Sequence, residues 1–254
     1  MISESIIAGG RQLASLFFVP KEFTHIIIIC HGFRGTRENG GRIYSFAERL
    51  NRIGLAAVAF DFSGSGQSSG AFADNTLSSQ ARDLKLVIEH SAKRFSRPII
   101  LLGRSFGGST VLAGGSTDPR VAAFIFWSTP VQLEQTFRGM LQNDYDLLLN
   151  GRPITAQDDG GTFQIGPGLV ADFSRHNFKD YTSRIGERPV LIVQGESDQV
   201  VPLINGRLLK SHLPNSTLWL LPEADHRFTQ HTTWREVETV KWIERVVLKR
   251  GEGE

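Results

Sequence analysis

Five short, uninterrupted apolar runs constrain the fold of this chain more than any other feature of its sequence. They are HIIIIC at 25–30, LAAVAF at 55–60, PIILL at 98–102, VAAFIFW at 121–127 and PVLIV at 189–193. Each has the length of a strand, and none shows the polar and apolar alternation of a strand with one solvated face. Such runs are typical of strands buried on both faces, which occur in parallel sheets covered by helices on either side.

Helical patterns separate these runs. Apolar residues recur at helical spacing in 41–54, 78–95, from Ser105 to about Ala113, in 202–213 and in 232–250. In the last segment, the residues expected largely on one apolar face are Trp234, Val237, Val240, Trp242, Ile243 and Val246. The repeated order of strand, helix and strand predicts an α/β fold with a doubly wound, mostly parallel sheet.

Two segments depart from this repeat. Residues 2–8 and 11–19 alternate and are joined by Gly9 and Gly10, which predicts antiparallel strands at the N-terminus. Residues from about 131 to 188 are irregular and too many for a simple connection in a compact domain. We therefore expect one domain, residues 1–254, with a small cap inserted at about 131–188.

Composition narrows the possible partners. The 28 basic and 26 acidic side chains are interspersed and leave a net charge of +2, so no basic block predicts nucleic-acid binding. Cys30 is the sole cysteine, which excludes an internal disulfide; we expect a small buried apolar residue, with a reactive thiol as the alternative. No signal peptide or run of about 18 apolar residues occurs, so we expect a cytoplasmic protein without a membrane partner. Neither a phosphate-binding loop nor metal-ligand spacing is present, and we expect no cofactor.

The stretch LLGRSFGG at 101–108 follows a predicted buried strand and precedes a predicted helix. In that context, Gly-x-Ser-x-Gly indicates a sharp elbow that exposes the serine, here Ser105, with an ordinary turn as the alternative. Gly103 and Gly107 allow the strand and helix to approach closely. The Phe106 N–H at the start of the helix can then face a developing oxyanion.

A nucleophilic serine needs a base and an acid that orients the base. Asp198 follows the strand at 189–193, and His226 follows the next predicted strand, STLWLL at 216–221. Because loops at the carboxyl edge of a parallel sheet can converge, we predict Ser105, His226 and Asp198 to act together.

Other candidates are less suited to these roles. Glu196 comes too early after its strand, and the side chain of Asp225 would diverge from the adjacent His226. His31 precedes Gly32 and is expected to form structural hydrogen bonds. Ser65 is expected in a flexible turn that Asp61 holds through backbone amides. The remaining histidines are expected at the surface or in packing: His25, His90, His176, His212 and His231.

With these motifs in this order, the chain resembles the α/β-hydrolase superfamily over nearly its whole length. HGFRG at 31–35 is similar to the family's His-Gly oxyanion segment, and the resemblance implies that the Phe33 N–H is the second oxyanion donor. DFSGSGQSSG at 61–70 is similar to the family's loop beside the site. The subgroup it looks most like contains small acyl and feruloyl esterases, and it is also similar to monoacylglycerol lipases and serine exopeptidases with an inserted cap after the sixth strand.

This resemblance implies a serine esterase that cleaves small carboxylic esters, including short-chain acyl or feruloyl esters, through an acyl enzyme. A peptidase or amidase with the same residues, or a ligand-binding protein without turnover, is the alternative. One departure is Arg104, where the subgroup commonly has His; we expect it to pair with a buried carboxylate, or otherwise to place charge near the substrate. Aromatic residues in or near the insertion are candidates for an acyl or aryl pocket or for cap packing: Tyr145, Phe163, Phe173, Phe178 and Tyr181.

Overall fold

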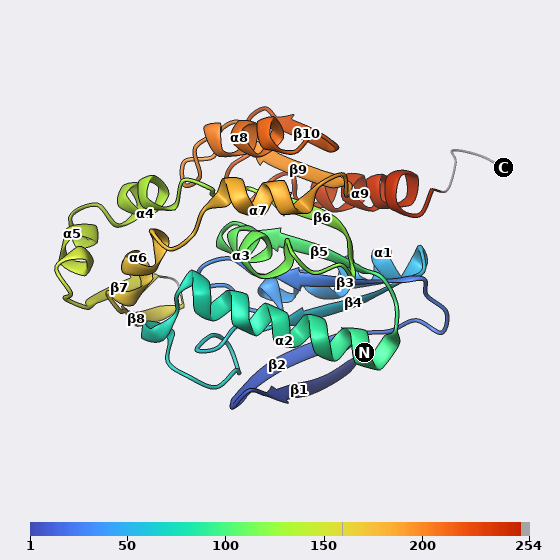
Figure 1. Cartoon of the computed structure of the whole chain (residues 1–254), viewed down its shortest axis with the longest axis horizontal. Coiled ribbons are helices and arrows are strands. Elements are labelled where there is room, and N and C mark those ends of the chain that lie inside the picture. The colour runs from blue at the N-terminus through green and yellow to red at the C-terminus, as the bar shows by residue number, and fades with distance from the viewer. Residues whose placement is uncertain (159, 250–254) are drawn as a thin grey trace.

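The computed structural model describes residues 1–158 and 160–249. Its main feature is an eight-stranded sheet in the order β1-β2-β4-β3-β5-β6-β9-β10 (Figure 1). The strands are β1 (Ile2–Ala8), β2 (Arg11–Phe18), β3 (His25–Cys30), β4 (Leu55–Phe60), β5 (Ile99–Arg104), β6 (Val121–Trp127), β9 (Val190–Gly195) and β10 (Ser216–Leu221). β2 pairs antiparallel with both of its neighbours, β1 and β4. All other neighbouring strands of the sheet, from β4 to β10, pair parallel. The predicted α/β fold with antiparallel N-terminal strands is confirmed.

Helices cover both faces of this sheet (Figure 1). On one face, α2 (Leu77–Phe95), α3 (Phe106–Gly115), α7 (Phe178–Ile185) and α8 (Ile204–His212) contribute to one apolar core. On the other face, α1 (Arg42–Arg52) and α9 (Thr232–Trp242) contribute to a second core. The described residues also form short helical turns: the 3-10 turns η1 (Asn39–Gly41) and η2 (Phe72–Asp74), and the π-helical turn η3 (Ile243–Val247). Burial of the central strands from both sides explains their continuous apolar sequence.

The C-terminal helix differs from the prediction. It ends at Trp242 and continues as the π turn η3, and Trp234 is 36% exposed rather than on the buried face. The residues buried on α9 are Thr232, Arg235, Glu236, Thr239 and Trp242. Their spacing is helical, but most of them are polar, so the apolar pattern alone does not define the whole buried face. Of the residues expected on that face, Trp242 and Ile243 are buried, and Val240 and Val246 pack against the second core.

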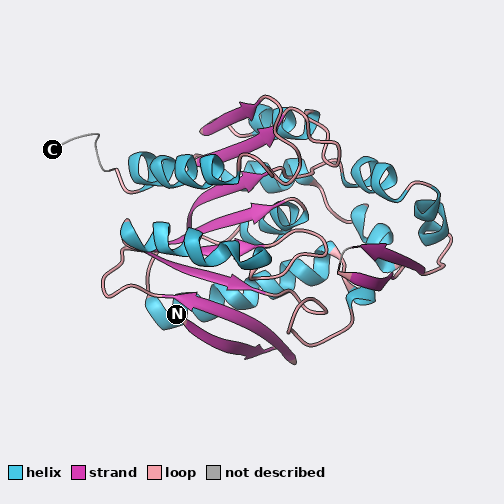
Figure 2. Cartoon of the chain, turned by 180° about the vertical axis from the view of Figure 1, so that it is seen from behind, coloured by secondary structure: helices cyan, strands magenta, loops and turns pink. Residues whose placement is uncertain are grey.

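The segment between β6 and β9 contains more regular structure than its sequence indicates. It forms α4 (Leu133–Leu141), α5 (Asn143–Leu149), the hairpin of β7 (Ile154–Asp158) and β8 (Gly161–Ile165), and α6 (Gly168–Phe173) before α7. These elements gather beyond the end toward which the parallel strands point (Figure 2). We call the elements from α4 to α6 the cap. That residues 1–254 form one domain with a cap inserted at about 131–188 stays a prediction.

Two further features bear on the sequence-based expectations. Cys30 is buried in β3, and burial raises the pKa of its thiol, which agrees with a packing role. Within residues 1–158 and 160–249, every helix is too short or too polar to cross a bilayer.

Candidate active site

Ser105 occupies a strained elbow between β5 and α3. Its backbone φ is 52° and its ψ is −129°, a conformation that is uncommon for a residue with a side chain. A Cβ at Gly103 would lie 2.4 Å from the Gly108 Cα, and one at Gly107 would lie 2.3 Å from the His31 carbonyl oxygen. Only glycine at these two positions allows the strand, the helix and the loop after β3 to approach this closely.

The predicted triad residues lie within hydrogen-bond distance of one another. His226 Nε2 is 3.0 Å from Ser105 Oγ, and His226 Nδ1 is 2.9 Å from Asp198 Oδ2. The three residues follow β5, β9 and β10, so their convergence results from strands that end at the same edge of the sheet. This order of hydroxyl, imidazole and carboxylate is suited to moving a proton from the serine to the ring.

The side chain of Asp198 is buried and held by several hydrogen bonds. Its Oδ1 accepts the backbone N–H groups of Val200 and Val201 at 2.9 and 2.8 Å, and its Oδ2 accepts Gln194 Nε2 at 3.0 Å. The carboxylate therefore faces the His226 ring in one orientation.

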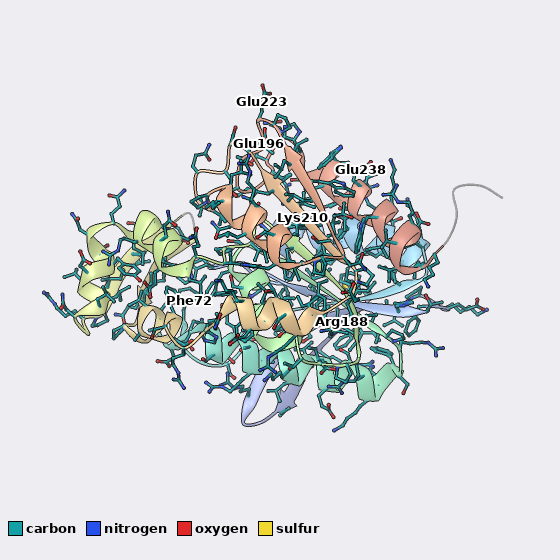
Figure 3. All side chains as sticks on the ribbon, turned by 45° about the horizontal axis from the view of Figure 1, so that its top comes forward. Phe72, Arg188, Glu196, Lys210, Glu223 and Glu238 are labelled. Atoms are coloured by element: carbon teal, nitrogen blue, oxygen red, sulfur yellow. The ribbon has the colours of Figure 1, made fainter. Side chains whose placement is uncertain are left out.

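The two rival acids are directed elsewhere. Asp225 accepts the backbone N–H and the hydroxyl of Thr229 at 2.7 and 2.6 Å. Glu196 is exposed, and Figure 3 shows it near Glu223 at the outer side of the loops that follow β9 and β10. Of the three carboxylates considered from the sequence, Asp198 is the one bonded to His226.

The predicted oxyanion donors lie in segments that border Ser105. Within residues 1–158 and 160–249, neither the Phe33 nor the Phe106 amide donates a recorded hydrogen bond to a protein acceptor. The Phe106 amide begins α3, directly after the elbow, and Phe33 lines the same cavity as Ser105. A Cβ at Gly32 would lie 3.1 Å from the Ser105 Cβ, so the HGFRG segment approaches the serine closely. Both amides are thus available to an oxygen bound beside Ser105.

His31 shapes this segment. Its Nε2 accepts the Phe62 N–H at 3.2 Å, so the ring proton lies on Nδ1, which donates to the Gly32 carbonyl at 2.8 Å. Burial is the main reason that the pKa of His31 lies below its ordinary value. The ring thus forms the structural hydrogen bonds expected from the sequence.

The loop after β4 is held by Asp61, as expected. Its carboxylate accepts the Arg37 and Gln67 backbone N–H groups at 2.6 and 3.0 Å and forms a buried ion pair with Arg37. The expectation of a flexible turn at Ser65 is wrong, because Ser65 is 7% exposed and Ser68 bonds back to both Ser65 and Asp61.

A cavity of about 600 Å³ opens beside Ser105 and His226. Phe33 and Met140 contribute apolar surface, whereas its basic lining consists of Arg34, Arg42, Arg104, Arg227 and Arg235. Arg34 makes two bonds to Asp158 of β7, at 3.0 and 3.1 Å, and its guanidinium lies 4.0 Å from the centre of the Phe163 ring. The site is therefore much more cationic than the overall charge of the chain indicates.

Arg104 does not pair with a buried carboxylate. Its Nη1 donates to Asn39 Oδ1 at 2.9 Å, and within the described residues it forms no ion pair within 4.0 Å. The amide of Asn39, which belongs to η1, occupies the place where a carboxylate was expected. Arg104 lines the cavity instead, which agrees with the alternative that it places charge near the substrate.

The aromatic residues of the insertion pack within the protein. In the described part of the chain, the lining of this cavity includes none of the five candidates, which are Tyr145, Phe163, Phe173, Phe178 and Tyr181. Tyr145 and Phe173 are buried in the core of the cap, where Phe173 meets Phe137 at 5.0 Å between ring centres. Phe72, labelled in Figure 3, links cap and sheet through contacts with Phe33 and Phe163.

His176 is more than a surface or packing residue. Its Nε2 lies 3.0 Å from both Ser78 Oγ and Asp172 Oδ2, and its Nδ1 lies 2.8 Å from the Tyr181 hydroxyl. Asp172 also accepts the Ser78 backbone N–H at 2.7 Å. Serine and carboxylate contact the same ring nitrogen here, whereas at His226 they contact opposite nitrogens. This group therefore does not have the triad arrangement found at Ser105, and its hydrogen bonds connect α6 to α2.

The part of the chain that the structure describes contains no group of three or more His, Cys, Asp or Glu residues arranged to hold a metal ion.

Comparison with known proteins identifies the class. Residues 21–151, just over half of the chain, match the hydrolase family described as serine aminopeptidase, S33, and the chain belongs to this family. The structure is similar to that of Est1E from Butyrivibrio proteoclasticus with ferulic acid bound, with a TM-score of 0.80, 23% identity, and 96% and 99% of the two chains covered. The α/β-hydrolase resemblance predicted from the sequence is confirmed.

Two relatives illustrate the range of this similarity. A monoacylglycerol lipase from Mycolicibacterium smegmatis is 24% identical over 240 residues, which is 84% of each protein. The quorum-quenching protein AidA from Acinetobacter baumannii is 36% identical over 106 residues, which is 40% of this chain. The alignment spans only about a third of the length of AidA, 34%.

Proposed function

We propose that the protein is a serine hydrolase that cleaves carboxylic esters. The observation that carries this proposal is the pair of contacts at His226, 3.0 Å to Ser105 Oγ and 2.9 Å to Asp198 Oδ2. A serine hydroxyl is a poor nucleophile at neutral pH unless a base takes its proton. The ring of His226 is within reach of that proton, and Asp198 orients the ring.

In this mechanism, Ser105 Oγ attacks the ester carbonyl while His226 Nε2 takes the serine proton. The amides of Phe33 and Phe106 stabilise the negatively charged oxygen of the tetrahedral intermediate. His226 returns the proton to the leaving alcohol, and an acyl group remains on Ser105. Water, activated by the same ring, then attacks the acyl enzyme and releases the acid and free Ser105.

Relatives support an ester as the substrate. They include a monoacylglycerol lipase and a mouse palmitoyl-protein thioesterase, and a structural neighbour binds ferulic acid. An alkoxide also leaves more readily than an amine, which requires protonation. We propose small acyl and feruloyl esters as the first substrates to assay.

The family description favours an aminopeptidase as the second candidate. An aminopeptidase needs an acidic group for the positively charged substrate terminus. Among the described residues that line the cavity, Asp158 is the acidic one, and it already accepts two hydrogen bonds from Arg34. Side-by-side assays with nitrophenyl esters and aminoacyl nitroanilides separate the two candidates, and we expect turnover of the esters only.

A fluorophosphonate probe tests the proposal directly. We expect it to label Ser105, as identified by peptide mass spectrometry, and Ser105→Ala to lower kcat by roughly 10⁶. The matched control is Ser78→Ala, since Ser78 contacts a histidine and a carboxylate away from this cavity. Wild-type protein that neither reacts with the probe nor hydrolyses any ester would favour the alternative of a binding protein without turnover.

The cellular setting is a separate proposal. We propose a cytoplasmic enzyme that acts on a small-molecule ester and has neither a nucleic-acid nor a membrane partner.

A further inference from the structure

The cavity beside Ser105 contains arginines that neither the ester chemistry nor the fold requires. Arg34 is neutralised by Asp158, but Arg42, Arg104, Arg227 and Arg235 form no ion pair within 4.0 Å among the described residues. They come from α1, the end of β5, the loop after β10 and α9. Four positive charges from separate elements thus converge on one cavity wall.

Arg235 is the most informative of these residues. It is 2% exposed, and its Nε and Nη1 atoms are buried without a hydrogen-bond partner. Its guanidinium lies 4.2 Å from the centre of the Trp127 ring and 4.7 Å from that of Phe228. These ring faces orient the cation but accept none of its N–H groups in the way a carboxylate or phosphate does. A buried charge is costly unless it is paired, so this position is suited to a bound anion.

Repulsion among the neighbouring arginines also favours a bound anion. The pKa of Arg104 lies below its ordinary value, first because of burial and then because of the positive charges of Arg227 and Arg42. Burial and the charge of Arg104 lower the pKa of Arg235 to about 9. Arg42 donates to the Thr232 hydroxyl, and Arg227 is an exposed residue of the cavity lining. The mutual repulsion of these groups falls when an anion lies between them.

The carboxylates near the cavity do not supply this anion. Asp158 is bonded to Arg34, Asp198 to His226, and Asp225 to Thr229. Glu236 follows Arg235 on α9 and is buried; its charge raises the pKa of Arg235, but among the described residues it forms no ion pair within 4.0 Å.

From this arrangement we propose that the cavity contains a subsite for a carboxylate or phosphate group of the substrate, which we call the oxyanion subsite. The preferred substrates are then esters that also carry one of these groups. The inference deepens the proposed function and rests on it. A planar guanidinium binds either group through paired N–H donors, so the shared chemistry is a compact oxyanion. The same charges disfavour neutral long-chain and cationic substrates.

A matched ester series tests the inference. On the acyl side, 4-nitrophenyl butyrate, hemisuccinate and 4-aminobutyrate differ mainly in terminal charge. On the alcohol side, phenyl butyrates with a 3-hydroxymethyl, 3-carboxy or 3-phosphonooxy group separate carboxylate from phosphate recognition. We expect at least one anionic ester to exceed its neutral analogue in kcat/KM by about 10- to 100-fold, the effect of one charge-assisted hydrogen bond. The cationic ester should fall below the neutral one.

Exposed arginines provide variants that should fold. Arg42→Gln and Arg227→Gln should each lower the ratio of anionic to neutral kcat/KM, by roughly tenfold for the residue nearer the bound group. Arg52→Gln is the matched control, because Arg52 is exposed on the same helix as Arg42 and pairs with Glu48; its ratio should equal that of wild type. Raising NaCl from about 0.1 to about 1 M should reduce the preference through screening.

A binding measurement separates this inference from the proposed function. Inorganic phosphate should raise the melting temperature of the wild-type protein, and the Arg42→Gln/Arg227→Gln double variant should lose most of that rise. If no ester reacts but phosphate stabilises the protein through these arginines, the oxyanion subsite stands and the esterase proposal fails. If neutral esters react while no anionic ester is preferred on either side, the oxyanion subsite is overturned and the esterase proposal stands.

Discussion

Replacing Asp198 by asparagine tests the proposed mechanism at the atom that controls the His226 tautomer. Asp198 Oδ1 accepts two backbone amides, those of Val200 and Val201. The asparagine oxygen takes this position, because an NH₂ group there would face two backbone donors, whereas at Oδ2 it faces one side-chain donor, Gln194 Nε2. Its NH₂ group then replaces Oδ2, which lies 2.9 Å from His226 Nδ1. Oδ1 lies 3.0 Å from the same ring nitrogen, but it already accepts the two backbone amides. To accept the new donor at Oδ2, the ring gives up its proton at Nδ1 and carries it at Nε2.

In that tautomer the ring presents an N–H to Ser105 and cannot take the serine proton. We expect kcat for 4-nitrophenyl butyrate at pH 7 to fall by about 10⁴, equivalent to about 5 kcal/mol in the activation barrier. Nitrogen NMR of His226 should show the proton moving from Nδ1 to Nε2, while the unfolding transition stays cooperative.

The matched control for this substitution is Asp225→Asn, which alters the carboxylate adjacent to His226 that bonds Thr229 instead. Its kcat should stay within about twofold of wild type, as for most surface substitutions. The reasoning would be refuted if Asp198→Asn kept kcat within about tenfold of wild type, or if Asp225→Asn caused the larger loss.

Three further predictions concern stability. Gly107→Ala should lower the free energy of unfolding by about 3 kcal/mol or more, because the new Cβ would lie 2.3 Å from a backbone oxygen. The control Gly139→Ala, where open space surrounds the new Cβ, should raise the free energy of unfolding by about 0.5–1 kcal/mol. Equal urea midpoints for the two variants would contradict this prediction. Asp61→Ala leaves the buried Arg37 with only the long, exposed ion pair to Glu38, at 4.0 Å, and should cost about 3–5 kcal/mol in urea unfolding. A loss below about 1 kcal/mol would argue against a buried pair with Asp61. Burial holds the pKa of His31 below its ordinary 6.5, so as the pH falls the unfolded chain takes up this proton before the folded protein does. The free energy of unfolding should therefore fall as the pH drops below about 6.5, by at most about 1.4 kcal/mol per pH unit. His31→Gln should flatten this slope, and an unchanged slope would assign it to other groups.

Much of the fold and the serine elbow could be predicted because their signals are local. Runs such as LAAVAF in β4 report burial on both faces, and the spacing of Gly103, Ser105 and Gly107 reports a turn that only small neighbours allow. Positions just after strands also place Asp198 and His226, since parallel strands end at one edge. The contacts among the three side chains match that expectation.

Other features depended on partners distant in the sequence. Asn39 lies where a carboxylate was expected beside Arg104, and His176, between α6 and α7, contacts Ser78 of α2. The aromatic residues of the insertion were expected either in a pocket or in packing; Tyr145 and Phe173 are buried in the cap core, and in the described part of the chain none of the five lines the cavity. No short window of sequence contains both members of such pairs.

By itself, the sequence determined the layered α/β fold, the strained serine and the edge at which the reactive groups meet, since periodicity, glycine positions and strand ends are properties of neighbouring residues. The tertiary structure alone decided the charge of the cavity. Arg235 lies on the mostly polar buried face of α9, and only the packing of that helix against Trp127 and Phe228 brings its guanidinium beside the elbow. The charges nearly cancel along the chain, but the fold brings five arginines that are distant in the sequence into the lining of one cavity, which is therefore cationic.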